Sequence, residues 1–215
     1  MKTVAFVPIK MNSQRVPHKN ILPLGKHALA WYIFEALQGV QGIDRIYVYC
    51  SDPEIQRYIP EGVVFLQRDP YLDGNEVKGF EIYERFIRSV DADVYVLSHA
   101  TSPFISTDSI QNALNHVISG ENDSAFAAKR IQNFLWSEEG PLNYDPNDVP
   151  RTQDIKPVFS EVGAFYMFRK EVFTEMRRRI GLKPYIQQLD EVEGVDIDEP
   201  EEFEFARMIA RFKDI

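Results

Sequence analysis

The stretch TVAFVPIKMNSQRVPHKNI, residues 3–21, joins an apolar run to a polar loop. Residues 3–9 form a short and almost continuous apolar segment, which is typical of a buried strand. The loop that follows carries Lys10, Arg15 and Lys19 but no acidic residue, although the whole chain has 33 Asp+Glu against 24 Lys+Arg. A segment with apolar residues at helical spacing comes next, at residues 28–40. This order of strand, loop and helix predicts the first unit of an α/β fold.

The same alternation continues along the chain. Apolar runs predict strands at residues 45–51, 63–68, 93–100, 123–131 and 162–168, and amphipathic segments predict helices at residues 51–60, 75–90, 106–119, 171–181 and 199–213. The pattern predicts a single α/β domain over residues 1–215, with a Rossmann-like, mostly parallel sheet flanked by helices. Ligands bind at the carboxyl ends of the strands in such sheets. The loops that follow the strands, the opening loop among them, are therefore expected on one rim.

The regular pattern breaks at about residues 134–160, where Pro, Asn, Asp and Gly are frequent. This segment has too few apolar residues to form a core of its own. We therefore expect an extended arm that protrudes from the domain and serves as an interface, rather than a second folding unit.

Charge and cysteine content narrow the class of protein. The net charge of −9 argues against a general nucleic-acid or anionic-membrane surface. The single cysteine, Cys50, allows no internal disulfide and suits a reducing compartment. No segment approaches the ~18 apolar residues of a membrane span, and the apolar run at the start is too short for a signal peptide. These features predict a cytoplasmic protein with neither a nucleic-acid nor a membrane partner.

The opening loop has two interpretations. A strand followed by a polar loop and a helix presents backbone N–H groups to an anion. Lys10, Arg15 and Lys19 would surround a polyphosphate, and Ser13 and Asn20 would donate hydrogen bonds. Neither GxxxxGK[ST] nor GxGxxG is present. The alternative is a solvated basic turn, and the loop alone does not decide between them.

Two aspartates lie near the other end of the chain, in GVDIDEPEEF. In an extended segment, Asp196 and Asp198 would point to the same side. Two carboxylates on one side suit Mg²⁺, which takes its remaining ligands from phosphate and water. The alternative is an acidic loop in which Asp198 caps the last helix, with Pro200 in its first turn.

Five segments resemble motifs of the CMP-sialic acid synthetases, relatives of the CMP-Kdo synthetases. KMNSQRVPHKNI (10–21) is similar to their first motif, ARxxSKxxPxKN, and VDIDEPEEFEFA (195–206) is similar to DIDxPEDFxxA. Between them, HATSPFIS (99–106), PRTQ (150–153) and VGAFYMF (162–168) resemble QPTSPLR, PRQ and NGAIYI. The motifs occur in the family's order and span nearly the whole chain.

The resemblance implies a nucleotidyltransferase-type fold and a cytidylyltransferase activity. The enzyme would couple CTP to a sialic-acid-like (nonulosonic) sugar acid, with Mg²⁺, giving a CMP-sugar and pyrophosphate. It also implies a homodimer formed through the arm. Activation of another 3-deoxy-ulosonic acid such as Kdo, or a nucleotide-binding homologue that has lost its chemistry, remain the alternatives.

The resemblance also assigns roles to residues. The catalytic residues would be Lys19, Lys10 and Asp198, with Lys19 on the leaving pyrophosphate, and the metal ligands would be Asp196 and Asp198. The nucleotide would contact Lys10, Ser13, Arg15, Lys19, Asn20 and Arg68, with Asp73 in the same pattern as Arg68. The sugar acid would contact His99, Arg151 and Tyr166, and Arg151 would meet its carboxylate.

Several positions depart from the family pattern. Lys10 replaces the first arginine, which keeps the charge but loses the bidentate fork. The Ser-Lys pair reads Ser13-Gln14, with the cation displaced to Arg15, and Ile105 and Val162 replace an arginine and an asparagine. These departures leave the identity of the sugar acid open and motivate the alternative of a homologue without catalysis.

Overall fold

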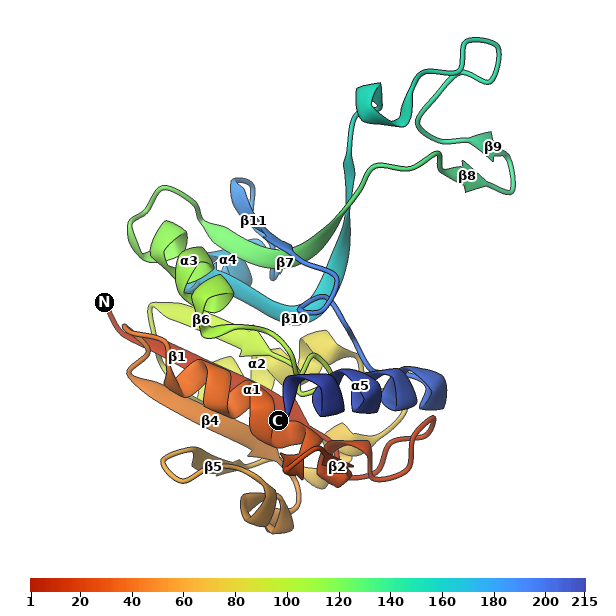
Figure 1. Ribbon diagram of the computed structural model, residues 1–215. Helices are drawn as coiled ribbons and strands as arrows, with labels where there is room; N and C mark the ends of the chain where they lie inside the picture. The colour runs from red at the N-terminus through yellow and green to blue at the C-terminus, as the bar shows by residue number, and fades with distance from the viewer.

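A computed structural model describes residues 1–215. Its centre is a seven-stranded sheet in the order β11-β7-β10-β6-β1-β4-β5, with β1 (Thr3–Ile9) flanked in parallel by β4 (Arg45–Cys50) and β6 (Val94–Ser98). The only antiparallel member is β10 (Val158–Arg169), which lies between β6 and β7 (Figure 1). The predicted mostly parallel α/β sheet is confirmed.

The remaining elements follow the predicted alternation closely. The other strands are β2 (Pro23–Leu24), β3 (His27–Ala28), β5 (Val64–Gln67), β7 (Ser124–Ile131), β8 (Trp136–Ser137), β9 (Gly140–Pro141) and β11 (Pro184–Leu189). The α-helices are α1 (Leu29–Gln38), α2 (Gly79–Ser89), α3 (Thr107–Ile118), α4 (Lys170–Thr174) and α5 (Pro200–Lys213). Short 3₁₀ helices cover Lys19–Ile21, Pro53–Tyr58, Pro70–Asp73 and Thr152–Asp154.

Helices cover both faces of the sheet, because the apolar side chains of β1 point alternately to one face and to the other. Ala5 and Val7 pack in one buried cluster with α1 and α3. Val4 and Phe6 pack on the opposite face in a second cluster with α2 and α4. Successive side chains of a strand point to opposite faces, so one apolar run builds two cores. No helix of the structure combines the length and apolar character needed to cross a membrane.

A third cluster joins the two ends of the chain. Phe203 and Ala206 of α5 pack against Leu24 and Leu29, which follow the opening loop. The cap of α5 is Glu199, which forms a reciprocal capping box with Glu202. The alternative in which Asp198 caps this helix is therefore wrong, and its carboxylate is available for other contacts.

The segment between β7 and β10 protrudes from the domain as predicted (Figure 1). It contains only the two-residue strands β8 and β9 and a short 3₁₀ helix, and large apolar side chains such as Trp136, Leu142 and Val149 are 60–64% exposed. We call residues 132–157 the arm. Its part in dimerisation remains a prediction.

One prediction about the last third of the chain is wrong, and one strand there was not predicted. The helix expected at 171–181 ends at Thr174, and Arg177 takes a left-handed backbone conformation with φ of 55°. Beyond the helix, the backbone N–H groups of Arg177 and Arg178 donate to the carbonyls of Phe173 and Val172. Asp123 then accepts hydrogen bonds from the N–H groups of Leu182 and Lys183, just before β11, an unpredicted edge strand with two glutamines in its PYIQQL sequence.

Candidate active site

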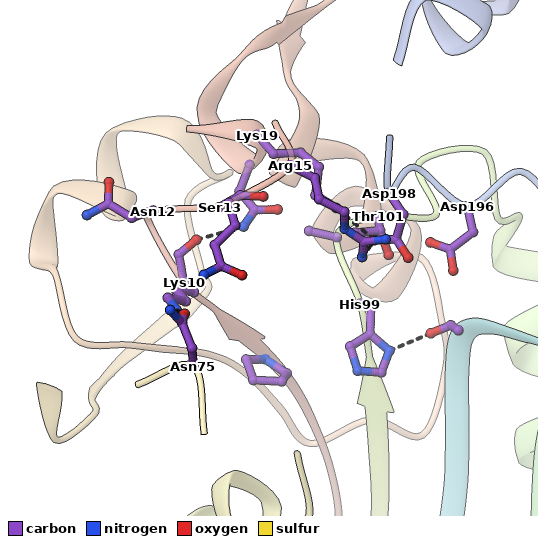
Figure 2. A pocket seen from close by; sticks show the side chains of 15 residues that line it. Lys10, Asn12, Ser13, Arg15, Lys19, Asn75, His99, Thr101, Asp196 and Asp198 are labelled. Carbon is purple, nitrogen blue, oxygen red and sulfur yellow. Dashed lines mark hydrogen bonds and ion pairs between the residues drawn. The ribbon is translucent and has the colours of Figure 1, made fainter. Parts of the chain in front are cut away.

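A cavity of about 470 Å³ lies at the carboxyl ends of β1 and β6 (Figure 2). It is lined almost entirely by polar side chains. Among the residues expected to form the site, it brings together Lys10, Ser13, Arg15, Lys19, Asn20, His99, Asp196 and Asp198. The structure does not place Arg68, Arg151 or Tyr166 on the wall of this cavity. The opening loop and the Asp196–Asp198 segment, from opposite ends of the chain, are therefore two sides of one site.

Ion pairs connect these two sides. Lys19 is only 8% exposed, and its Nζ donates to the Ile197 carbonyl at 2.5 Å and to Asp198 Oδ1 at 3.1 Å. Arg15 reaches Asp198 at 3.0 Å and Glu199 at 2.9 Å. Burial raises the pKa of Asp198, but Lys19 and Arg15 outweigh it and hold this pKa below its ordinary value. Asp198 is therefore ionised at neutral pH.

The acidic segment is held in place by backbone contacts. The Ile197 N–H donates to the Thr101 carbonyl at 2.8 Å, which ties the segment to the loop after β6. Asp196 Oδ1 is buried and has no hydrogen-bond partner. A buried carboxylate oxygen without a partner is costly, and a cation or a ligand hydroxyl would satisfy it.

The carboxylates of Asp196 and Asp198 fit a magnesium ion that also has phosphate ligands. No group of three or more His, Cys, Asp or Glu side chains is arranged to hold a metal. Asp196 and Asp198 both face the cavity, and Mg²⁺ is commonly held by one or two carboxylates plus phosphate oxygens and water. The two aspartates would therefore supply the protein ligands of a Mg²⁺ ion whose other ligands come from phosphate and water.

Asn20 shapes the opening loop from within. Its side-chain amide donates to the Lys10 carbonyl at 2.9 Å, so the expected nucleotide donor already has a partner in the loop. The Lys10 Nζ donates to Asn75 at 2.9 Å. Asn75 lies before α2 and lines the cavity, and no motif pointed to it.

His99 forms the floor of the cavity on the side of β10 (Figure 2). Its Nδ1 bonds to the Gly163 carbonyl, and its Nε2 lies 3.4 Å from the Tyr83 hydroxyl. Burial lowers the pKa of His99 more than the Gly163 carbonyl and Asp196 raise it. The ring is therefore neutral at pH 7, with Nδ1 carrying the proton because a carbonyl can only accept.

Arg68 supports a neighbouring cavity from behind. This second space, of about 410 Å³, shares Lys10 and Asn12 with the main cavity and includes Asp73. Arg68 is 2% exposed, pairs with Asp73 and lies 5.8 Å from the Tyr49 ring centroid. Arg68 and Asp73, which share one sequence pattern, thus form an ion pair, with Asp73 on the cavity wall and Arg68 buried behind it.

Arg151 and Tyr166 lie elsewhere. Arg151 is on the arm, is 79% exposed and pairs with Asp154 at 2.8 Å. Tyr166 is buried in β10, where its hydroxyl donates to Glu161 at 2.9 Å and the Arg179 guanidinium stacks on its ring at 3.7 Å. Neither residue touches the main cavity of its own chain.

Comparison with known proteins identifies the family of the chain. Residues 4–214 match the model of the family described as Cytidylyltransferase. The chain is 26% identical over 204 residues to N-acylneuraminate cytidylyltransferase A of Danio rerio, covering 90% of this chain and 47% of that protein. It is 26% identical over 227 residues to a pseudaminic acid cytidylyltransferase of Campylobacter jejuni, covering 97% and 96%.

A solved structure of CMP:2-keto-3-deoxy-manno-octonic acid synthetase complexed with CTP shares the fold. Its TM-score is 0.73 at 17% identity, with 99% of this chain and 100% of that chain covered. The chain spans about half the length of the first curated relatives that it matches. The match to the family model extends over almost every residue, from β1 to the end of α5. The chain belongs to the cytidylyltransferase family.

Proposed function

We propose that this chain transfers CMP from CTP to a sialic-acid-like sugar acid, with release of pyrophosphate. The observation that carries the proposal is that a cationic loop and two carboxylates face each other across one polar cavity. A triphosphate needs cations, and the metal that accompanies it needs carboxylates. The similarity to relatives named for N-acylneuraminate and pseudaminic acid supports a nonulosonic acid as the acceptor.

In the proposed reaction, a hydroxyl oxygen of the sugar acid forms a bond to the α-phosphorus of CTP. The bond from that phosphorus to the oxygen bridging to the β-phosphorus breaks, pyrophosphate leaves, and the hydroxyl proton is lost to water. The protein aligns the two reactants and stabilises charge on the phosphates. Lys10 and Lys19 would contact the triphosphate, with Lys19 on the leaving pyrophosphate. Ser13 and Arg15 would complete the cradle.

Asp196 and Asp198 would hold Mg²⁺, which supplies charge neutralisation on the phosphate oxygens. The support is the unpartnered Asp196 Oδ1 and the ionised state of Asp198. Nε2 of His99 would accept a hydrogen bond at the sugar side of the cavity. Arg68 and Asp73 would shape the nucleotide side.

We include a homodimer and a cytoplasmic location in the proposal. The arm exposes apolar side chains and carries Arg151 away from the cavity of its own chain. An arm that packs on a second copy would cover those side chains and would bring Arg151 towards a neighbouring site. The buried, unpaired Cys50 suits a reducing compartment.

The deciding experiment measures pyrophosphate release from CTP and Mg²⁺ with a panel of N-acetylneuraminic, legionaminic, pseudaminic and Kdo acids. We expect the highest kcat/KM with a nonulosonic acid. A maximum with Kdo would favour the alternative acceptor. Tight CTP binding by calorimetry without pyrophosphate release from any acid would instead indicate a homologue that has lost its chemistry.

A further inference from the structure

A separate cavity of about 410 Å³ lies between the start of α2 and the segment that follows α4. It is lined by Arg177, Arg178 and Arg179 together with a single acidic residue, Glu161. Three cations against one carboxylate make this wall positive, although the chain as a whole has a net charge of −9. A concave positive wall on an acidic protein favours an anionic ligand.

This cavity is adjacent to the proposed active site. Tyr83 lines it, and the Tyr83 hydroxyl lies 3.4 Å from Nε2 of His99, which lines the main cavity. The same relation holds along β10, where Glu161 lines the arginine cavity and Gly163, two residues later, lines the main one. The walls of the two spaces therefore meet at His99 and Tyr83 and along β10.

Arg179 is the best oriented of the three arginines. Its guanidinium stacks on the Tyr166 ring at 3.7 Å, and one of its nitrogens lies 3.3 Å from Glu161 Oε2. Tyr166 donates its hydroxyl to the same Glu161 oxygen at 2.9 Å, which fixes the carboxylate. A guanidinium stacked on a ring has its N–H groups pointing outwards in its own plane, and a single pair with Glu161 leaves most of its five donors available.

The other two arginines are less suited to recognise a ligand. Arg177 lies over Phe80 at 4.9 Å and pairs with Glu84 at 3.4 Å, so its charge is directed towards α2. Arg178 forms no ion pair and has no aromatic ring under its guanidinium. Only Arg179 combines a fixed plane with a place beside His99 and Tyr83, where it also opposes the burial that raises the pKa of Tyr83.

We propose that Arg179 binds the carboxylate of the acceptor sugar acid and thereby determines the preference for acidic over neutral sugars. This inference rests on the proposed function. A 2-ulosonic acid carries its carboxylate on the carbon that bears the reacting hydroxyl, so the two groups enter the site together. With the triphosphate on the opening loop, the sugar occupies the His99 side, and a planar guanidinium is the natural bidentate partner of a carboxylate.

The assignment differs from the one that the family resemblance implies, in which Arg151 meets the carboxylate. Arg151 is on the arm and its guanidinium is already bidentate with Asp154, at 2.8 and 3.1 Å. Arg179, by contrast, is part of the same domain as the main cavity and needs no second copy of the chain to be near it. The two arginines can therefore be tested against each other.

The experiment compares the preferred sugar acid with its C1 carboxamide in the full chain. The variants are Arg179→Ala, Arg179→Lys and Arg151→Ala. The control is Arg207→Ala, because Arg207 likewise stacks on an aromatic ring, at 4.9 Å over Phe203, and pairs with a glutamate, at 2.7 Å. Its side chain is 36% exposed, against 38% for Arg179. Pyrophosphate release gives kcat and KM, and calorimetry gives binding of the acid and of CTP.

We expect the wild-type chain to prefer the acid over the carboxamide by ~100-fold in kcat/KM, because an amide leaves the guanidinium without its charged partner. Arg179→Ala should lose this preference through the KM of the acid, with the KM of CTP unchanged, and Arg179→Lys should recover part of it. Arg207→Ala should retain it. If the preference for the acid is lost in Arg151→Ala but kept in Arg179→Ala, the assignment to Arg179 is wrong, whereas the proposed function still holds. If the wild-type chain neither binds nor turns over any acid, both this inference and the proposed function are wrong.

Discussion

Lys19 and Arg151 both lie in segments that resemble family motifs, yet their surroundings in the fold are opposite. Lys19 is buried, and its ammonium contacts two partners in a segment 178 and 179 residues away. Arg151 is exposed on the arm and contacts only Asp154, three residues along the chain. Long-range packing fixes the geometry of the first residue within one chain. The second has no such constraint, so its position depends on what the arm contacts.

The largest expected effect comes from removing the charge of Lys19. Lys19→Met keeps the apolar stem but removes the cation that faces Asp198. We expect pyrophosphate release to fall ~10³-fold, because a fixed cation stabilises charge that develops on the phosphates. Lys26→Met is the control, since Lys26 is 60% exposed and pairs only with the C-terminal Asp214. A Lys19→Met enzyme within tenfold of wild type would show that the buried cluster is structural only.

A smaller loss is expected from a methyl group at Gly163. A Cβ at this position would lie 3.1 Å from Asp196 Oδ2 and 3.9 Å from His99 Nδ1, so Asp196 would have to shift by a few tenths of an ångström. We expect Gly163→Ala to lower kcat by roughly 10-fold while the melting temperature changes little, because small misplacements of reacting groups are costly. Unchanged kcat would mean that the position of Asp196 is not critical.

Substitutions in the arm test the other half of the comparison, namely whether the arm contacts a second copy of the chain. Trp136→Ser with Leu142→Ser removes exposed apolar surface without touching either buried face of the sheet. If the arm joins two copies, light scattering should show the dimer dissociating at ~10- to 100-fold higher protein concentration, since aromatic anchors dominate interfaces. Circular dichroism and the unfolding midpoint of the variant should match those of the wild type at concentrations where both are monomeric. A wild-type chain that is monomeric at micromolar concentration would contradict the arm-mediated dimer.

The smallest effect concerns acid stability. The pKa of His99 is lower in the folded chain than the ordinary value of about 6.5. Below that pH the unfolded chain takes up a proton that the folded chain does not, so the free energy of unfolding falls as pH decreases, by at most about 1.4 kcal/mol per pH unit for one group. Chemical denaturation at pH 7.5 and 5.5 should therefore show a smaller loss for His99→Gln than for the wild type. Equal losses would show that His99 does not titrate differently in the two states.

Most of the fold could be predicted because its signals are local. The apolar runs of β1, β4 and β6 and the amphipathic segments of α1 and α3 are continuous in sequence, and their alternation determines a parallel sheet. The edge strand β11, which has two glutamines among its six residues and pairs only with β7, was not predictable in this way. Nor was the early end of α4, since no local signal in the arginine run announces the left-handed conformation of Arg177.

The residues of the candidate site also fall into those that local sequence signals define and those that only tertiary contacts define. Lys19 and Asp198 belong to motifs, and the structure places them in contact. Asn75, Tyr83 and Arg179 belong to none, and each is defined by a contact with a distant segment: Lys10, His99 and Tyr166 respectively. The run of three arginines was visible in the sequence, but nothing local distinguishes the one that stacks on a tyrosine from its two neighbours.

In the proposed site, the ion pairs between the opening loop and Asp198 would make the binding of nucleotide and metal cooperative. A triphosphate that takes Lys19 and Arg15 leaves Asp198 without its counter-charges, and a cation that takes Asp198 releases the two basic side chains. Each ligand therefore removes an obstacle to the other, and by linkage the gain in affinity is the same in both directions. A site arranged in this way would bind the metal–nucleotide complex as a unit and would discriminate against either component alone.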